Sequence, residues 1–129
     1  MSTLFSRIIA WEIPSYTIYE DEYVYAFLDI HPVQSGHTLL VPKVEISYFP
    51  ELEEPYHSAL FLAAKKIAIA IQKATNCTRV CTAFVWYEVP HVHYHLIPTN
   101  SIEEFQTTTT KTLSPEEFTT MQHNIIQYL

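Results

Sequence analysis

The sequence predicts a fold that combines five short strands with three helices, and three patterns carry that prediction. Histidines alternate with apolar residues in His91–Pro98, the twofold period of a strand with one polar and one apolar face. Apolar residues recur at helical spacing from Pro55 to Ala74. The stretch Ser114–Glu117 combines an N-cap serine, a first-turn proline and a glutamate that completes a capping box. For 129 residues we expect one domain over 1–129.

Local patterns give the expected limits of each element. Leu4–Ile9 has apolar residues on one side, which predicts a short helix that Pro14 ends. Residues 23–30 are almost continuously apolar, which predicts a strand buried on both faces. The other predicted strands cover residues 16–20, 37–41, 79–86 and 91–97, and the other predicted helices cover residues 55–74 and 114–127.

Charge and composition exclude several classes of partner. The net charge is −7 and the seven Lys and Arg side chains are dispersed, so no basic surface is available for nucleic acid. A bound phosphate must therefore be held by histidines and backbone N–H groups. No apolar run reaches the length of a membrane span and no targeting segment is recognisable at the N-terminus. We expect a cytoplasmic protein with no membrane partner.

The alternating histidines His91, His93 and His95 are predicted to point to one side of their strand, and three kinds of site fit this pattern. One is a solvated polar face. Another is a metal site, because alternate strand positions can supply two zinc ligands. The third is a catalytic cluster, because imidazole exchanges protons near neutral pH and can attack phosphorus as a nucleophile. The spacing alone does not choose among the three.

Several further segments make the sequence resemble the histidine triad (HIT) family. An aspartate ends the second predicted strand, and a Gly-His-Thr-Leu segment opens the third at the spacing typical of the family. The resemblance covers residues 4–98. It is carried by Glu12-Ile13-Pro14, Tyr19-Glu20-Asp21, Ala26-Phe27-Leu28-Asp29-Ile30, Pro32, Gly36-His37-Thr38-Leu39-Leu40-Val41-Pro42-Lys43 and Val89-Pro90-His91-Val92-His93-Tyr94-His95-Leu96-Ile97-Pro98.

The resemblance implies an α+β, HIT-like fold: a five-stranded antiparallel sheet with one long helix and short N- and C-terminal helices. It also implies chemistry at the α-phosphate of a nucleotide. By position His93 would be the nucleophile that forms a nucleotidyl-histidine intermediate. His91 and His37 would form the supporting network, and His95 would hydrogen-bond the phosphate. Nothing in the resemblance calls for a cofactor.

The same resemblance implies a set of substrate-binding residues. Asp29 matches the ligand of the ribose, although a carboxylate at that place can also serve as a simple turn cap. Apolar residues match the walls of the base pocket, where they can equally be ordinary core. The apolar positions are Phe5, Ile8, Phe27, Ile30 and Leu39, and Glu88 in the loop before the histidines completes the predicted set.

The sequence departs from the family at three places, one of which is the segment after Pro98, Thr99-Asn100 and then a threonine-rich loop, which would govern the leaving group. Trp86 and Tyr87 stand where a glycine-rich phosphate loop is usual, and they can narrow the pocket, stack on a leaving group or block the site. Some members hold a structural zinc through two cysteines and two histidines. The matching residues in this chain are Thr3, Ser6, Glu45 and His91, so we predict no metal at that place.

Together these observations predict a hydrolase or transferase that cleaves P–N or P–O bonds at the α-phosphate of a purine nucleotide conjugate. Phosphoramidase activity is preferred to dinucleoside-polyphosphate hydrolysis, because short phosphoramidates ask less of the altered loop. The alternatives are a nucleotide-binding module with impaired catalysis and a histidine-rich metal-binding protein. The apolar face of the helix over 55–74 is wider than one sheet needs, which predicts a homodimer.

Overall fold

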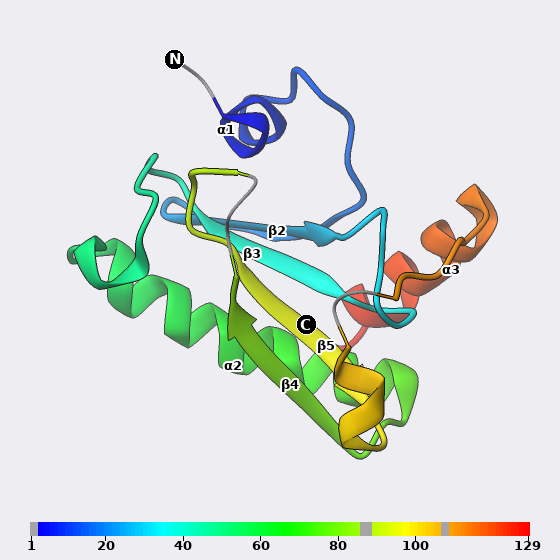
Figure 1. Cartoon of the computed structure of the whole chain (residues 1–129). Helices are drawn as coiled ribbons and strands as arrows, with labels where there is room; N and C mark the ends of the chain where they lie inside the picture. Colours follow the sequence, from blue (N-terminus) through cyan, green and yellow to red (C-terminus); the bar gives the residue numbers. More distant parts are fainter. Residues whose placement is uncertain (1–2, 86–88, 107–108) are drawn as a thin grey trace.

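An antiparallel sheet with helices on both faces forms the centre of the molecule (Figure 1). The structure is a computed structural model that describes residues 3–85, 89–106 and 109–129. The five strands lie in the order β1-β2-β3-β5-β4, and each pair of neighbours is antiparallel. The elements are α1 (Leu4–Ile9), β1 (Thr17–Glu20), β2 (Val24–Leu28), β3 (Thr38–Pro42), the 3-10 turn η1 (Phe49–Glu51), α2 (Tyr56–Thr75), β4 (Arg79–Phe84), β5 (Tyr94–Thr99), the 3-10 turn η2 (Ile102–Phe105) and α3 (Pro115–Ile126).

This architecture confirms the predicted α+β fold, but the last strand is displaced along the sequence. It begins at Tyr94 instead of His91 and continues through Pro98 to Thr99. Pro98 pairs with Val80 of β4 and lies past Leu96, the last residue of β5 that pairs with β3. Its missing N–H therefore interrupts no bond on the β3 side. The first two histidines precede the strand, where their backbone groups are free for other partners.

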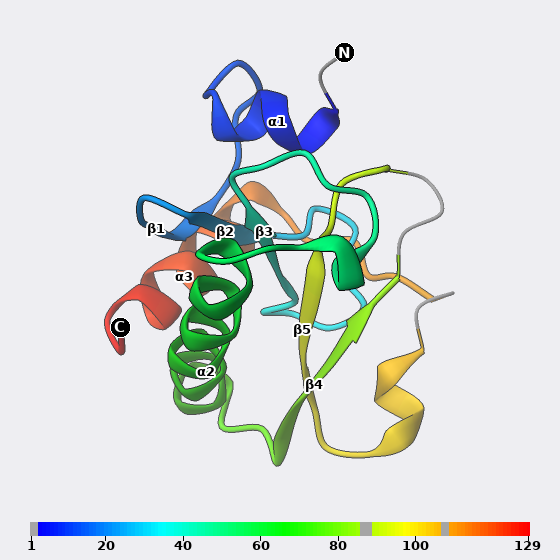
Figure 2. The same ribbon diagram turned by 90° about the vertical axis from the view of Figure 1, so that its left-hand side faces the viewer.

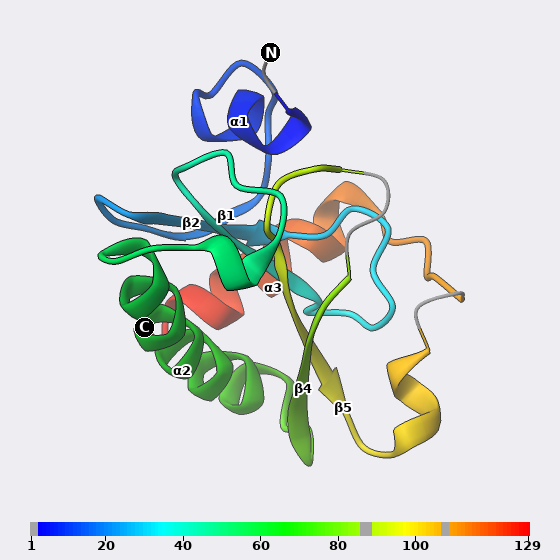
Figure 3. The same cartoon turned by 60° about the vertical axis from the view of Figure 1, so that its left-hand side comes forward.

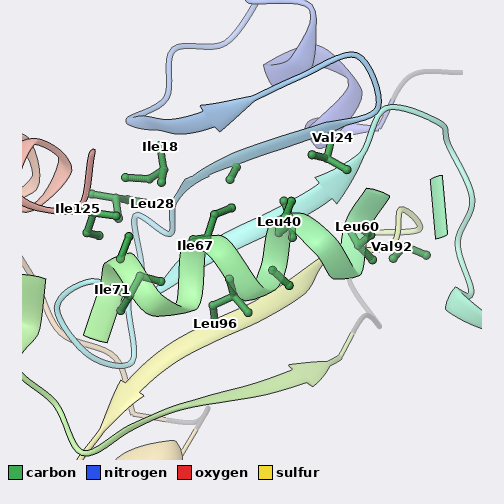
Figure 4. Close-up of a cluster of buried hydrophobic side chains, with 14 of the residues drawn as sticks. Ile18, Val24, Leu28, Leu40, Leu60, Ile67, Ile71, Val92, Leu96 and Ile125 are labelled. Carbon is green, nitrogen blue, oxygen red and sulfur yellow. The ribbon is translucent and has the colours of Figure 1, made fainter. Parts of the chain in front are cut away.

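The main core lies between the sheet and α2 (Figure 4). Alternate residues of β2, namely Val24, Ala26 and Leu28, enter this core. Their neighbours Tyr25 and Phe27 enter a second cluster on the opposite face. The predicted burial of this strand on both faces is therefore confirmed. Figure 2 shows α3 beside α2, and the two helices cover the same face of the sheet.

The short helix α1 lies on the other face of the sheet, across from α2 (Figure 1). It buries Phe5 and Ile8 against the second cluster. The helix ends at Ile9, so the prediction that Pro14 ends it was wrong. The reversal comes earlier because Trp11 adopts a left-handed conformation with φ of 63°. The N–H groups of the next two residues then return to the Arg7 carbonyl.

One turn needs a glycine, and it is the only glycine in the sequence. Gly36 has φ of +100°, a conformation that strains any residue with a side chain. A Cβ atom there would lie 3.1 Å from Cγ2 of Thr75 at the end of α2. It would also lie 3.5 Å from Sδ of Met121 in α3. The turn before β3 is therefore packed tightly against the helical layer.

Within the described residues, no helix is long and apolar enough to cross a bilayer. The apolar face of α2 is divided between the core and the surface. Leu60, Ile67 and Ile71 are completely buried, whereas Leu62 is 72 % exposed and Ile69 is 45 % exposed. The predicted excess of apolar surface on this helix is present.

The capping box at the start of α3 gives a test of local stability. The Ser114 hydroxyl accepts the Glu117 N–H at 3.1 Å, and the Glu117 carboxylate accepts the Ser114 N–H at 2.9 Å. Ser114→Ala removes the first bond, and we expect a loss of about 1 kcal/mol in the free energy of unfolding. Urea unfolding measures this loss. The exposed Thr112→Ala serves as the matched control. An equal effect of both substitutions would show that the cap contributes nothing.

Candidate active site

A pocket of about 530 Å³ opens between α1 and the sheet. Its walls are mostly apolar, and its polar side chains gather where β2 ends and β5 begins. Figure 3 shows the loop into β5 rising toward α1 at this place. The residues that line the pocket are Leu4, Phe5, Ile8, Ile13, Pro14, Ser15, Phe27, Leu28, Asp29, Ile30, His31, Leu39, Val85, Val89, His93 and His95.

His93 lies at the pocket with a defined tautomer. Its Nδ1 is 2.8 Å from the carbonyl oxygen of His91. A carbonyl can only accept, so Nδ1 carries the proton and Nε2 keeps its lone pair. The edge of the Phe5 ring packs on the imidazole with a centroid distance of 4.8 Å. His93 is 7 % exposed, which leaves Nε2 as a nucleophile in a largely dehydrated place.

His95 receives the opposite tautomer through a relay from the backbone. The Val33 N–H donates to Nδ1 of His37 at 3.0 Å, so the proton of the neutral His37 ring is on Nε2. That Nε2–H lies 2.9 Å from Nδ1 of His95 and donates to it. His95 must then carry its own proton on Nε2. One imidazole at the pocket therefore offers a lone pair and its neighbour offers an N–H donor.

His91 stands behind the pocket and is fully buried. Its Nε2 donates to the carbonyl of Pro42 at 2.8 Å, which leaves Nδ1 as an acceptor. The Thr3 hydroxyl lies 2.9 Å from that Nδ1 and donates to it. Both ring nitrogens are thus occupied, and the residue meets His93 through its backbone carbonyl. Its position agrees with a supporting role.

Burial keeps these imidazoles neutral. It lowers the pKa of His37 to about 3, with a further lowering from His95. It also lowers the pKa of His95 to about 4, while the Val85 carbonyl acts in the opposite direction. The pKa values of His91 and His93 are lowered for the same first reason. At neutral pH the site therefore holds lone pairs and N–H dipoles instead of imidazolium charges.

The two carboxylate oxygens of Asp29 have different contacts. Oδ1 accepts the His31 N–H at 2.9 Å and caps the turn after β2. Oδ2 lies 3.6 Å from Nε2 of His37, and the carboxylate lines the pocket. Burial raises the pKa of this carboxyl, because desolvation disfavours the charged form. A carboxylate in this place gains from hydroxyl donors that a ligand supplies.

The groups that could hold a metal are not the three alternating histidines. Among the described residues, Asp29, His37 and His95 place one ligand atom each within 4.8 Å of one another. However, the Val33 N–H already occupies Nδ1 of His37. A metal on Nε2 would require a His37 ring with no proton at all, which imidazole strongly resists. The donor set therefore favours the hydrogen-bonded relay over a metal ion.

The predicted site residues fall into three groups in the structure. All five predicted apolar residues line the pocket together with Asp29, His93 and His95. His37 and His91 lie behind it as bonded partners of those groups. Glu88 lies outside the described residues, as do Trp86 and Tyr87, so its assignment stays a prediction.

Sequence reasoning missed part of the pocket wall. Ile13, Val85 and Val89 line it, although none was assigned to the pocket; Ile13 and Val89 lie in segments that carry the family resemblance. Ser15 adds a hydroxyl that lies 3.0 Å from the buried Tyr25 hydroxyl. The position of Ser15, directly after the matched Glu12–Pro14 segment, was the available signal.

Comparisons with known proteins agree with this geometry. The HIT domain family matches residues 10–102. The adenosine 5′-monophosphoramidase HNT1 of Saccharomyces cerevisiae is 38% identical over 96 residues, which cover 74% of this chain and 61% of the yeast protein.

Solved structures agree as well. A Hit-like protein from Bartonella henselae, described as involved in cell-cycle regulation and crystallised with an unknown ligand, superposes with a TM-score of 0.85. It is 28% identical, and the match covers 99% of this chain and 97% of that one. A hypothetical histidine triad nucleotide-binding protein from Sulfolobus tokodaii gives a TM-score of 0.84 at 28% identity, over 96% and 89% of the two chains. The match to the family over most of the chain, together with the sheet, the buried histidine cluster and these relatives, shows that the chain belongs to the HIT domain family.

Proposed function

We propose that the protein is an enzyme that breaks a bond at the α-phosphate of a purine nucleotide conjugate, with P–N bonds preferred to P–O bonds. The observation that carries this proposal is the pair of complementary tautomers at one pocket. His93 offers its Nε2 lone pair, and the neighbouring His95 offers its Nε2–H. Their ring centroids are 5.1 Å apart, close enough for both to engage one phosphate group.

The reaction follows from these two roles. Nε2 of His93 attacks phosphorus, the P–Nε2 bond forms, and the P–N or P–O bond to the leaving group breaks with its electron pair. The leaving group takes up a proton from solvent. The phosphorylated imidazole then carries positive charge, which the His91 carbonyl stabilises through the Nδ1–H bond. Water attacks phosphorus next, the electron pair returns to Nε2, and a proton is released to solvent.

The rest of the pocket suits a nucleoside. A carboxylate beside the histidines can accept hydrogen bonds from the two ribose hydroxyls, which is the role we assign to Asp29. Apolar walls formed by Phe5, Ile8 and Leu39 suit a flat base. The name of the yeast relative, an adenosine 5′-monophosphoramidase, supports the choice of a P–N bond.

The first test measures AMP release from adenosine 5′-phosphoramidate. We expect His93→Ala to reduce the rate by at least about a thousandfold, because no other lone pair in the described site replaces Nε2. His123→Ala removes an exposed histidine of α3 and should leave the rate unchanged. Wild-type protein that binds AMP without turnover would instead identify a binding module. Equal rates in wild type and His93→Ala would refute the mechanism.

The pH dependence of this activity follows from the burial of His93. Because its pKa is lowered from 6.5, the reactive neutral form persists below pH 6.5 and is lost only as the pH falls through the lowered pKa. We expect kcat/KM to be flat from neutral pH down to below 6.5 and then to decline. A pH–rate profile checks this dependence, measured with a substrate that the enzyme cleaves but that does not hydrolyse by itself at low pH. A midpoint at or above 6.5 would contradict the inferred neutral, desolvated site.

The exposed face of α2 and the neighbouring strand β4 support a homodimer. β4 is the last strand of the sheet order, so its outer edge is available for pairing. Leu62 on α2 is 72 % exposed, and Phe61 is 39 % exposed. Covering this apolar surface with a second copy removes it from water.

Light scattering tests the dimer. We expect a mass of twice the 15.0 kDa chain for the wild type and of a single chain for Leu62→Asp. Ile126→Asp on α3 changes a similarly apolar but separate exposed site and should leave the mass unchanged. A single-chain mass for the wild-type protein would exclude this dimer.

A further inference from the structure

A hydrogen-bonded clamp joins the N-terminus of α1 to the segment after β3 and to the histidine cluster. One carboxylate oxygen of Glu45, Oε1, accepts the Thr3 N–H at 2.6 Å and the Ser6 hydroxyl at 2.6 Å. The Thr3 hydroxyl in turn reaches Nδ1 of His91 at 2.9 Å. We call these four residues, Thr3, Ser6, Glu45 and His91, the Glu45 clamp.

The clamp occupies the four positions at which some members of the family hold zinc, and its groups do not fit that ion. Zinc in structural sites takes thiolate and imidazole ligands. Thr3 and Ser6 supply hydroxyls, which are poor ligands for zinc, and both are already bonded. Hydrogen bonds between these side chains therefore connect the segments at this place.

The helix that the clamp holds cannot stand alone. A helix of six residues is far too short to be stable in water without tertiary contacts. Its apolar side provides Phe5 and Ile8 to the buried cluster, and the half-buried Ile9 packs against the same cluster. Thr3 also caps the first turn, because its hydroxyl accepts the Ser6 N–H at 3.1 Å. The clamp thus fixes the end of α1 from which the pocket wall begins.

The clamp also leads directly to the nucleophile. The Thr3 hydroxyl fixes one nitrogen of the His91 ring, and the Pro42 carbonyl fixes the other. The carbonyl of the same His91 residue holds Nδ1 of His93. On the other side, Phe5 of the clamped helix packs its ring 4.8 Å from that of His93. The imidazole of His93 is therefore supported from two directions by parts that the clamp joins.

We propose that Glu45 is a positioning residue for the nucleotide site: it holds α1 as the wall of the base pocket and, through Thr3 and His91, keeps His93 in its reactive orientation. The assignment of a nucleotide to the pocket rests on the proposed function. Glu45 does not line the pocket, so it acts only through the groups that it binds. Because its carboxylate is exposed, substitution there leaves no buried charge without a partner.

Kinetics of Glu45→Ala with adenosine 5′-phosphoramidate test the proposal. We expect KM to rise about tenfold, since the wall that faces the base loosens, and kcat to fall by a smaller factor. Glu53→Ala removes an exposed carboxylate outside the Glu45 clamp and should leave KM and kcat unchanged. Unchanged KM and kcat in Glu45→Ala would overturn the proposal. So would a lower melting temperature with unaltered AMP affinity, because the role would then be structural only.

A second pair of variants separates the hydroxyl from the size of the side chain. Thr3→Val keeps the shape but removes the donor to His91, whereas Thr3→Ser keeps the donor. We expect Thr3→Ser to retain wild-type kinetics and Thr3→Val to resemble Glu45→Ala. The nitrogen chemical shift of His91 Nδ1 should change only in Thr3→Val, because that nitrogen loses its hydrogen-bond donor while the Pro42 carbonyl still holds the proton on Nε2. Identical behaviour of the two Thr3 variants would refute the link to His91.

Amide hydrogen exchange distinguishes failure of this proposal from failure of the proposed function. If wild-type protein neither binds nor cleaves adenine nucleotides, the proposed function fails and the pocket wall has no such ligand. Exchange in residues 4–9 still reports whether the clamp holds α1. We expect exchange there to accelerate at least about tenfold in Glu45→Ala and to stay unchanged in Glu53→Ala. Equal exchange in both would disprove the clamp itself.

Discussion

The hydrogen bond from Nδ1 of His93 to the His91 carbonyl is the contact on which the site depends. It exists because the chain at these two residues is outside the sheet ladder, so the carbonyl is free to accept a side-chain proton. A backbone group also sets the tautomer of His95. The Val33 N–H fixes the proton position on His37, and His37 in turn donates to His95. Backbone groups cannot change their donor or acceptor character with pH, and this makes the tautomers of both rings a property of the fold.

The absence of Lys and Arg from the described pocket lining gives this control its importance. No Lys or Arg belongs to the described lining, and burial keeps the histidines neutral at physiological pH. The proposed phosphate would therefore meet oriented N–H dipoles, and positive charge would appear beside it, on the imidazole, only when a bond to His93 forms. Interactions of this kind strengthen as the reaction proceeds and do not simply retain the substrate.

The spacing of apolar residues along the sequence predicted the strands, and the fold confirms them. The alternation around His91–Pro98 identified a strand, and the apolar run of β2 identified burial on both faces. The predicted start of the last strand at His91 was wrong, because the alternation of histidines and apolar residues extends beyond the residues that pair with β3. The Glu45 clamp joins residues 39 to 88 positions apart, and such contacts leave no local pattern in a sequence. The apolar wall residues that were predicted came from the family resemblance, since an apolar side chain at a pocket looks like any core residue.

The turn at Gly36 connects the histidine end of the pocket with the helices behind the sheet. The next residue is His37, and the absent side chain of Gly36 leaves room for Thr75 of α2 and Met121 of α3. A change in how these helices pack would move the turn, and with it the first side-chain link of the relay to His95. The packing of the two helices and the tautomer of His95 are therefore linked through this one turn.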